Sequence, residues 1–374
     1  MLSFRRYMPF YRTFSTSLRR HLSESSSPIH HRIIYSTSNN IWFNLATEEW
    51  LSNTIKPNEQ ILFLWQNDRC VIIGRNQNPW KECFLERMHN DNVLLARRRS
   101  GGGAVYQDLG NTCFTFLVSA LTHQIDKNAN SNIILNVLKN VYSIDGKIMG
   151  RNDLVLSSDG RKFSGSAYQY TRTSALHHGT LLLNVDLNAM KRYLNPNKEK
   201  LKSKGVDSIQ ARVINLTEIN SSIKHQDICT ALENEYIKYH QKQSSSSFMK
   251  TTEYLSPIVL DKITDLNNSY KMYSDEKWRY GQTFSFNHEI EKRFQWGTVN
   301  ICISSERNGI IDTCEIYSDS LFVNVIDELK RNISGQMYTV ESIKTALMKA
   351  KENVESQQEK EMIDDIQAWI LTHI

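Results

Sequence analysis

The chain has 374 residues, 40% hydrophobic and 23% charged, a composition typical of a globular protein with roughly two domains at about 150 residues each. Its net charge of +5 lies in residues 1–23, which hold five arginines and no acidic residue; without them Lys+Arg falls from 45 to 40 and equals the 40 Asp+Glu. The neutral remainder excludes a general polyanion-binding surface, and no apolar run approaches the roughly 20 residues of a membrane-spanning helix, so we expect neither a nucleic-acid nor a membrane partner.

The leading segment, residues 1–23, is rich in Arg, Ser and aromatic residues, and the first acidic residue is Glu24. This composition is typical of a mitochondrial transit peptide, which binds its import receptor as a basic amphipathic helix. A disordered basic tail is the alternative. No apolar core of 7–15 residues follows the charges, which argues against a secretory signal. We therefore expect the mature protein in the mitochondrial matrix.

Strand and loop signals alternate through the first third of the chain. Ile61–Trp65, Val71–Gly74 and Val93–Ala96 are short apolar runs that predict buried strands. A helix is expected to begin at Asn78-Pro79, because proline is favoured in the first helical turn. Three consecutive glycines then exclude regular structure at Gly101–Gly103.

Strands outnumber helices in the next stretch. Strands are expected at 104–107, 112–118, 154–156, 162–170 and 178–185, with an amphipathic helix around Ile133–Tyr142. Asp159-Gly160 and Asn308-Gly309 are hairpin turn signals. This mixed order favours an α+β sheet fold over a parallel α/β one. Gln241–Ser247 is polar and serine-rich, which is typical of a flexible linker before a second unit.

Six scattered cysteines give no metal signal. None forms a C-x-x-C pair, so neither a zinc site nor a thioredoxin motif is indicated. Single cysteines of this kind suit a reducing compartment and are usually small core residues.

The segment Arg97–Gly103 places three arginines beside three glycines between two strands. Glycines let backbone N–H groups approach a ligand, and arginine forks bind phosphate through two parallel hydrogen bonds. The segment therefore predicts an anion-binding loop. A surface loop with solvated charges is the alternative, because it can have the same sequence. It is neither a Walker loop nor a dinucleotide fingerprint, because no Gly-Lys-Ser/Thr follows and the glycines are contiguous.

Three further positions carry candidate chemistry. Lys162, just after the Asp159-Gly160 turn, can place a point charge on a phosphoryl or carbonyl oxygen. His177 and His178 are adjacent in a strand, so only one of them can face a pocket. Asp153 can bind magnesium, which prefers one or two carboxylates plus substrate phosphates, or it can cap a turn.

In combination these motifs resemble the bacterial-type lipoate–protein ligase A family, within the biotin/lipoate ligase superfamily, as a mitochondrial fungal-type member. The resemblance runs from about Tyr35 to the C-terminus. It is carried by Leu64-Trp65, Gly74–Cys83, Ala96–Arg98, Ser100–Tyr106, Asp108–Phe116, Gly150–Leu154, Lys162, Ser164–Tyr168, His177–Leu183, Trp278, Tyr280–Gln282 and Phe294–Gly297.

The resemblance implies a biotin/lipoyl ligase-type mixed sheet with helices, followed by a small α+β accessory domain. It divides the chain into a transit peptide (1–23), a lipoate-binding catalytic domain (32–243), a linker (244–252) and the accessory domain (253–374). The substrates would be ATP and lipoate with Mg²⁺. The acceptors would be the lipoyl domains of 2-oxoacid dehydrogenase E2 subunits and the glycine cleavage H protein.

The site residues that the resemblance implies fall into two overlapping sets. The ATP site would hold Arg98, Gly103, Ala104, Val105, Tyr106 and Lys162. The lipoate site would hold Lys162, Arg98, Gly102 and His178. Lys162 would be the catalytic residue, and Asp153 the candidate magnesium ligand.

The chain departs from the family at two positions. Gln107 stands where members often carry histidine, which puts any acid/base role there in doubt. Arg99 stands where a small polar residue is frequent, so a contact with ATP should not be assumed for it.

The chemistry implied is ATP-dependent activation of lipoate to lipoyl-AMP, followed by transfer to a carrier lysine. An amidotransferase using a preformed acyl donor is the alternative that the motifs separate least well. A biotin ligase would need the Gly-Arg-Gly-Arg loop, which is absent, and an octanoyltransferase would need a nucleophilic cysteine, which the motifs around Lys162 and His178 lack. A non-enzymatic carrier-binding protein would not need the intact lysine and Arg/Gly loop.

Overall fold

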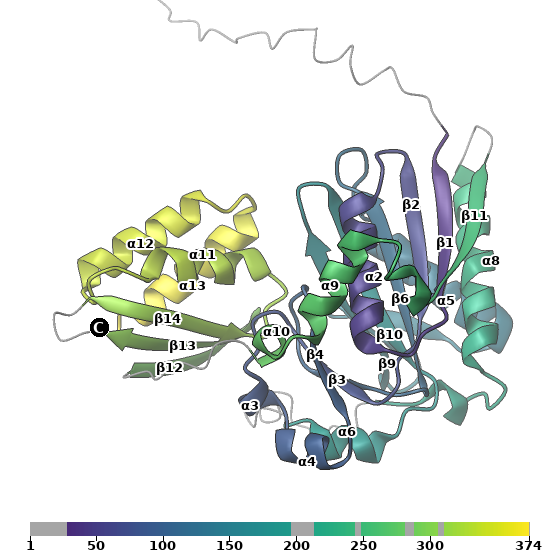
Figure 1. The fold of residues 1–374 in the computed structure, drawn as a ribbon, viewed down its shortest axis with the longest axis horizontal. Helices are drawn as coiled ribbons and strands as arrows, with labels where there is room; N and C mark the ends of the chain where they lie inside the picture. Colours follow the sequence, from purple (N-terminus) through teal and green to yellow (C-terminus); the bar gives the residue numbers. More distant parts are fainter. Residues whose placement is uncertain (1–27, 196–212, 244–247, 281–287, 306–309, 374) are drawn as a thin grey trace, which may run out of the picture.

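A computed structural model describes residues 28–195, 213–243, 248–280, 288–305 and 310–373 (Figure 1). They form a large domain that ends in a short connecting helix and a smaller C-terminal domain beside it. Within these residues no helix is long and apolar enough to cross a membrane. The transit peptide predicted at 1–23 and the Asn308-Gly309 turn lie outside the described residues.

The large domain is built on an eight-stranded mixed sheet, which confirms the predicted α+β class. Its first strand pairs in parallel with both of its neighbours, and the remaining pairs are antiparallel. In spatial order the strands are β11 (Met249–Leu255), β1 (His30–Ser36), β2 (Glu59–Trp65), β6 (Asn111–Ser119), β10 (Ser174–Leu182), β9 (Lys162–Tyr170), β8 (Asp153–Leu156) and β7 (Gly146–Met149).

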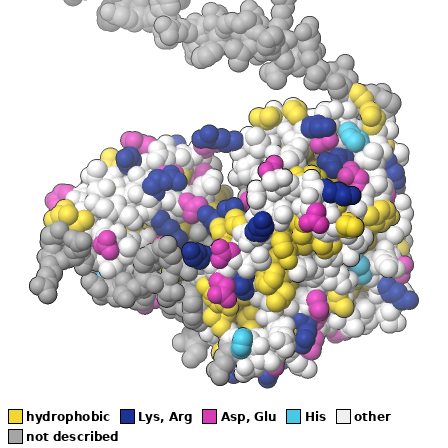
Figure 2. Space-filling view, viewed as in Figure 1, with side chains coloured by type: hydrophobic (Ala, Val, Ile, Leu, Met, Phe, Trp, Pro, Cys, Tyr) yellow, Lys and Arg dark blue, Asp and Glu magenta, His cyan; other side chains and the backbone are white. Residues whose placement is uncertain are grey.

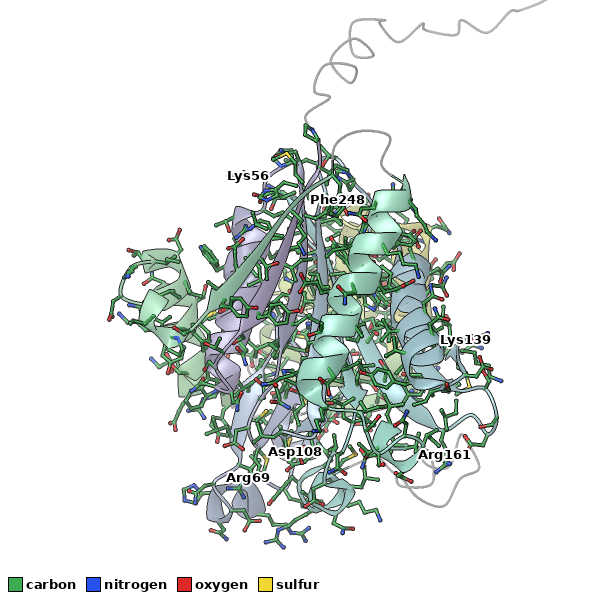
Figure 3. The ribbon with its side chains drawn as sticks, turned by 90° about the vertical axis from the view of Figure 1, so that its right-hand side faces the viewer. Lys56, Arg69, Asp108, Lys139, Arg161 and Phe248 are labelled. Atoms are coloured by element: carbon green, nitrogen blue, oxygen red, sulfur yellow. The ribbon has the colours of Figure 1, made fainter. Side chains whose placement is uncertain are left out.

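Helices cover both faces of this sheet, so its central strands are buried on both sides and consist of nearly continuous apolar runs. One face is covered by α5 (Lys127–Tyr142) and α8 (His225–Gln243), which lie side by side in Figure 3. The other is covered by α2 (Ile41–Thr54), with α9 (Thr264–Ser274) packed on its outer side. The Asn40 side chain caps α2 by accepting from the N–H groups of Trp42 and Phe43.

A second, three-stranded sheet carries the glycine-rich segment. Its strands pair in the order β4 (Leu94–Arg97), β3 (Cys70–Ile73) and β5 (Val105–Gln107), so residues 98–104 form the connection between its two outer strands. Three short helices flank this sheet: α3 (Pro79–Glu82), α4 (Leu85–Asn90) and α6 (Leu187–Tyr193). The single helix predicted from Pro79 is divided, because Phe84 leaves the helical conformation before α4 begins.

The C-terminal domain has its own apolar core between a three-stranded sheet and three helices. These elements are β12 (His288–Phe294), β13 (Gly297–Ser305), β14 (Ile311–Ser318), α11 (Val323–Ile333), α12 (Val340–Glu352) and α13 (Gln357–Ile370). The helix α10 (Glu276–Tyr280) lies between the two domains (Figure 1).

The structure corrects the domain boundary expected from the sequence. A linker was predicted at 244–252 and the second domain from 253, but β11 pairs with β1 across Met249–Leu255 and α9 packs on α2. Both elements therefore belong to the large domain, and the smaller sheet begins only at His288. Residues 244–247 are outside the described residues.

Candidate functional site

Most of the predicted site residues line one pocket at one end of the large sheet. Asp108 and Arg161, the neighbours of Gln107 and Lys162, are labelled at this end in Figure 3. Seven of the predicted residues line the pocket: Arg98, Gly102, Gly103, Ala104, Val105, Lys162 and His178. Tyr106 does not, because its buried ring packs on Tyr193 at a centroid distance of 5.7 Å.

The pocket has a polar end and an apolar end. Lys162 lies at the polar end with Asn152 and Ser166, whose backbone and side-chain groups hydrogen-bond one another. At the other end the lining comes from one buried hydrophobic cluster to which α2, β2, β3 and β6 contribute: Leu45, Trp65, Ile72 and Cys113. An elongated acid with one charged end fits this division, since its carboxylate is attracted to the lysine and its tail leaves water.

Lys162 begins β9 and points along the strand. The pairing of β8 with β9 shifts register at Leu154/Val155. The Lys162 side chain crosses Gly165, and a Cβ added to this glycine would stand 2.8 Å from Nζ. Its ammonium lies 2.7 Å from the Asp153 carboxylate. Lysine 162 thus enters the pocket over a glycine, with one carboxylate as its counter-ion.

Arg98 holds the glycine-rich segment in shape from inside. Its guanidinium donates to the Ser100 Oγ at 3.0 Å, to the Ile72 carbonyl at 3.2 Å, and to the Gly101 and Gly103 carbonyls at 2.7 and 2.9 Å. Burial lowers its pKa to about 10, against the opposing effect of Glu48, so it stays charged at neutral pH. In this structure Arg98 fixes the loop, rather than presenting its whole fork to a phosphate.

A buried hydrogen-bond chain connects this loop to the pocket wall. The Glu48 carboxylate accepts from Thr115 Oγ1 at 2.6 Å and lies 2.9 Å from His178 Nδ1, and His178 Nε2 lies 2.8 Å from Ser100 Oγ. A carboxylate can only accept, so Nδ1 carries a proton, and the Ser100 hydroxyl continues the chain at Nε2. Glu48 belongs to no motif in the sequence, and only the fold connects it through His178 to Ser100.

The two adjacent histidines face opposite sides of the sheet, as the strand period predicts. His178 lines the pocket, whereas His177 is fully buried among Phe114, Phe116 and Tyr168. Burial lowers the pKa of His177 to about 3, so this ring is neutral. Its role is packing.

The other two arginines of the segment hold the connecting helix α10. Arg97 donates to the backbone carbonyls of Trp278 and Arg279 at 3.0 and 2.9 Å, and the Trp278 indole N–H donates back to the Arg97 carbonyl at 2.9 Å. The Arg99 guanidinium lies 4.4 Å from the Trp278 ring centroid and forms an ion pair with Glu49 at 2.9 Å. Arg99 therefore helps to hold α10, the helix that lies between the two domains.

The small domain rests on the same loop. The Gly102 N–H donates to the Ser320 carbonyl at 3.1 Å, and a Cβ on Gly101 would stand 2.1 Å from that carbonyl oxygen. The Ser318 N–H donates to the Asn76 carbonyl at 2.7 Å. In the view of Figure 2, Lys and Arg side chains gather where the two domains meet. Glycine at position 101 is thus required by the close approach of the small domain.

No metal site is built from protein ligands alone. Among the described residues, no group of three or more His, Cys, Asp or Glu side chains could hold a metal ion. Asp153 stands beside Lys162 as a single carboxylate. Its assignment as a magnesium ligand stays a prediction.

Known protein families match both domains. Residues 40–237 match the family described as the lipoyl protein ligase A/B catalytic domain, and residues 283–370 match the bacterial lipoate protein ligase C-terminus. A lipoate-protein ligase A of Psychrobacter cryohalolentis is 41% identical over 343 residues, 91% of this chain and 98% of the relative. One of Blochmanniella floridana is 39% identical over 345 residues, 92% of this chain and 98% of the relative.

Solved structures agree with these relatives. The LipL1 of P. falciparum, in complex with lipoate, superimposes with a TM-score of 0.78 at 36% identity, covering 92% of this chain and 99% of that one. A bi-partite lipoate protein ligase of Thermoplasma acidophilum, studied with its E2 lipoyl domain, has a TM-score of 0.57 at 25% identity and covers 69% and 98%.

Proposed function

The chain belongs to the lipoate–protein ligase A family, and from this membership we propose how its pocket activates lipoate with ATP and passes the lipoyl group to a lysine. The observation that carries the proposal is Lys162, whose ammonium reaches the polar end of the pocket and, among the described residues, has the Asp153 carboxylate as its one counter-ion. An anionic substrate can pair with the ammonium in place of this carboxylate, and Asp153 then needs a cation of its own.

In the first half-reaction the lipoate carboxylate attacks the α-phosphorus of ATP. A bond forms between a carboxylate oxygen and phosphorus, and the bond to pyrophosphate breaks, which gives lipoyl-AMP. Negative charge on the α-phosphate oxygens is stabilised by Lys162 and by N–H groups of the Gly103–Tyr106 backbone. Arg98 acts by holding this backbone in place through the Gly101 and Gly103 carbonyls.

In the second half-reaction the amine of an acceptor lysine attacks the acyl carbonyl of lipoyl-AMP, and AMP leaves with its bonding electron pair. Lys162 then stabilises the oxyanion that forms on the carbonyl. Water must be kept out, because a mixed anhydride hydrolyses, and the apolar end of the pocket favours its exclusion.

ATP binding involves Mg²⁺ in this proposal. Magnesium neutralises phosphate charge and needs only one or two protein carboxylates beside the phosphates. Asp153 fits this need, because it lies next to Lys162 where the α-phosphate would bind. An Asp153→Asn variant should raise the magnesium concentration needed for half-maximal exchange; an unchanged requirement would remove Asp153 from this role.

Cys113 argues against an acyl-cysteine mechanism of the octanoyltransferase type. Its thiol lines the pocket, but complete burial raises its pKa well above the usual value. The thiol donates to Gln107 Oε1 at 3.3 Å and therefore stays protonated, whereas the thiolate is the nucleophile in such a mechanism. The full-length relatives, which are lipoate-protein ligases, favour ATP activation over transfer from a preformed donor.

The acceptors that we propose are lipoyl domains, namely those of 2-oxoacid dehydrogenase E2 subunits and the glycine cleavage H protein. The Thermoplasma relative, which was studied with an E2 lipoyl domain, supports this class. The arginine-rich, acid-free residues 1–23 support action in the mitochondrial matrix. Deleting them should abolish import and leave the activity of the purified enzyme intact; import of the truncated chain would refute the location.

The role of Lys162 is tested by Lys162→Ala in each half-reaction separately. Lipoate-dependent ATP–pyrophosphate exchange and transfer from supplied lipoyl-AMP should both fall by roughly 10²–10³-fold, as for a lost preorganised donor. Lys162→Arg should rescue neither fully, because a planar fork cannot replace a compact ammonium. Normal rates for the alanine variant in both assays would mean that the residue assignment is wrong.

A further inference from the structure

We propose that Gln107 selects lipoate over saturated acids of the same chain length, by donating a carboxamide N–H to a sulfur of the dithiolane ring at the apolar end of the pocket. This inference rests on the proposed function and adds a specificity-determining residue to it. It concerns a position at which this chain departs from the histidine that the family often carries.

A chain of buried amides fixes which way the Gln107 side chain points. Asn44 Nδ2 shares its two protons among three acceptors, which are the backbone carbonyls of Ser38 and Gln66, each at 3.0 Å, and Asn67 Oδ1 at 2.8 Å. Because two of these acceptors are backbone carbonyls, the Asn44 amide cannot be flipped. Its orientation makes Asn67 Oδ1 an acceptor, so the other end of the Asn67 amide must donate.

The orientation of Asn67 in turn fixes the orientation of Gln107 in the pocket wall. Its Nδ2 donates to Gln107 Oε1 at 2.6 Å, and the Cys113 thiol donates to the same oxygen at 3.3 Å. With both donors on Oε1, the Gln107 NH₂ group is directed away from them. Gln107 is 3% exposed and lines the pocket, and no described residue accepts a hydrogen bond from its Nε2. Gln107 Nε2 therefore presents N–H groups to the pocket that are uncharged at every pH.

The apolar neighbours of Gln107 indicate which part of the substrate it meets. Cys113 contacts it directly, Trp65 pairs with Cys113 between β2 and β6, and both belong to the hydrophobic cluster at the apolar end. When the acid carboxylate lies at Lys162, its tail extends to this end. The ring sulfurs are the only acceptor atoms in a lipoyl tail, and sulfur accepts weakly.

An octanoate chain has no acceptor in this place. It would leave the Gln107 N–H groups unpaired in a dry apolar site, and such unmade hydrogen bonds are costly. The preference for lipoate over octanoate is therefore expected to be at least roughly five-fold, and not the far larger factor of a strong oxygen acceptor. The protonated Cys113 thiol, held by Gln107 Oε1, is also kept from attacking the ring disulfide, which requires a thiolate.

The test compares lipoate with octanoate in acid-dependent ATP–pyrophosphate exchange and in calorimetric binding, on the full chain. Gln107→Met removes the donor and should lower the lipoate/octanoate ratio at least five-fold, mainly by improving the use of octanoate. Asn67→Asp, outside the pocket, offers only acceptors, so Gln107 should turn its NH₂ group toward it and lose the same preference. Gln107→His should keep the preference, because one ring nitrogen accepts from Asn67 and the other carries N–H.

Gln66→Met is the matched control, because the Gln66 Nε2 donates to the Leu109 carbonyl and does not line the pocket. Its ratio should equal that of the wild type. If the wild type shows exchange but the lipoate/octanoate ratio is unchanged in both Gln107→Met and Asn67→Asp, the sulfur contact is wrong and the proposed function still stands. If Gln107→Met does not fold, an unchanged ratio in Asn67→Asp is enough to overturn the sulfur contact. A wild-type enzyme without exchange for either acid overturns the proposed function and this inference together.

Discussion

At the scale of single residues, the pocket depends on the path of one side chain. Lys162 reaches the polar end only because Gly165 has no Cβ in its way. The sequence points to Lys162 through its hairpin turn and its family motif, but not to the crossing, which depends on the register shift between β8 and β9. The same holds for Glu48, whose partners Thr115 and His178 lie 67 and 130 positions away along the chain.

Gly165→Ala should move the Lys162 ammonium by tenths of an ångström or more, since the new methyl group would stand 2.8 Å from Nζ. Misplacement by about 1 Å costs roughly a hundred-fold in rate, so this smaller shift should lower kcat/KM for lipoate several-fold, with roughly a hundred-fold as the upper limit. Ser164→Ala is the control, since Ser164 neighbours it on β9 but does not line the pocket. Equal activity of the two variants in steady-state assays would contradict the geometry.

His177 gives the large domain a defined response to acid. Its pKa is lowered from 6.5 to about 3 by burial, so the unfolded chain binds a proton before the folded one does. The stability that neutral His177 contributes is complete above pH 6.5 and is lost as the pH falls from 6.5 toward 3, by about 1.4 kcal/mol per pH unit. In urea unfolding between pH 7 and 5, His177→Gln should show a shallower loss of stability than the wild type; identical slopes would exclude His177 as a source.

At the scale of elements, the Arg/Gly segment joins three parts of the molecule. Arg98 shapes the loop, Arg97 and Arg99 hold α10 through Trp278, and the glycines receive the small domain at Ser320. The three arginines and three glycines of this segment predict an anion-binding loop. They do not show that Arg97 and Arg99 contact α10 and not a ligand, because α10 lies about 180 residues further along the chain.

Trp278→Ala should loosen the loop as well as the helix. The substitution removes the stacking with Arg75 and Arg99 and the hydrogen bond to the Arg97 carbonyl. For a half-buried tryptophan we expect a loss of about 2 kcal/mol, with faster amide hydrogen exchange in both α10 and residues 97–103. Tyr254→Ala, an exposed aromatic on β11, should change neither segment. Faster exchange confined to α10 would show that the two are not coupled.

Most strands and the amphipathic helix of the sequence prediction agree with the structure, and two of the elements that it missed, β11 and α2, have identifiable physical causes. β11 is an edge strand that is exposed along most of its length, so it shows no apolar alternation. α2 is buried on most of its surface between the sheet and α9, and therefore lacks a clear polar face. Both belong to pairings that are distant in sequence, which local patterns do not encode.

At the scale of the whole molecule, the small domain contacts the loop that would bind ATP. The Gly102 N–H, which the family pattern assigns to the substrate site, donates to the Ser320 carbonyl of the small domain. A ligand that needs this N–H must displace the contact. For such a ligand the position of the small domain would be linked to occupation of the pocket, and a boundary placed at 244–252 gives no sign of this contact.

The central claim is that this chain activates free lipoate itself, and the measurement that tests it most directly is lipoate-dependent ATP–pyrophosphate exchange by the purified wild-type protein. The account predicts exchange that requires lipoate and Mg²⁺, together with transfer from supplied lipoyl-AMP to a lipoyl domain. A protein that shows no exchange, yet rapidly transfers the lipoyl group from supplied lipoyl-AMP or from a lipoylated donor protein, would contradict it: the pocket would be right and the reaction class wrong.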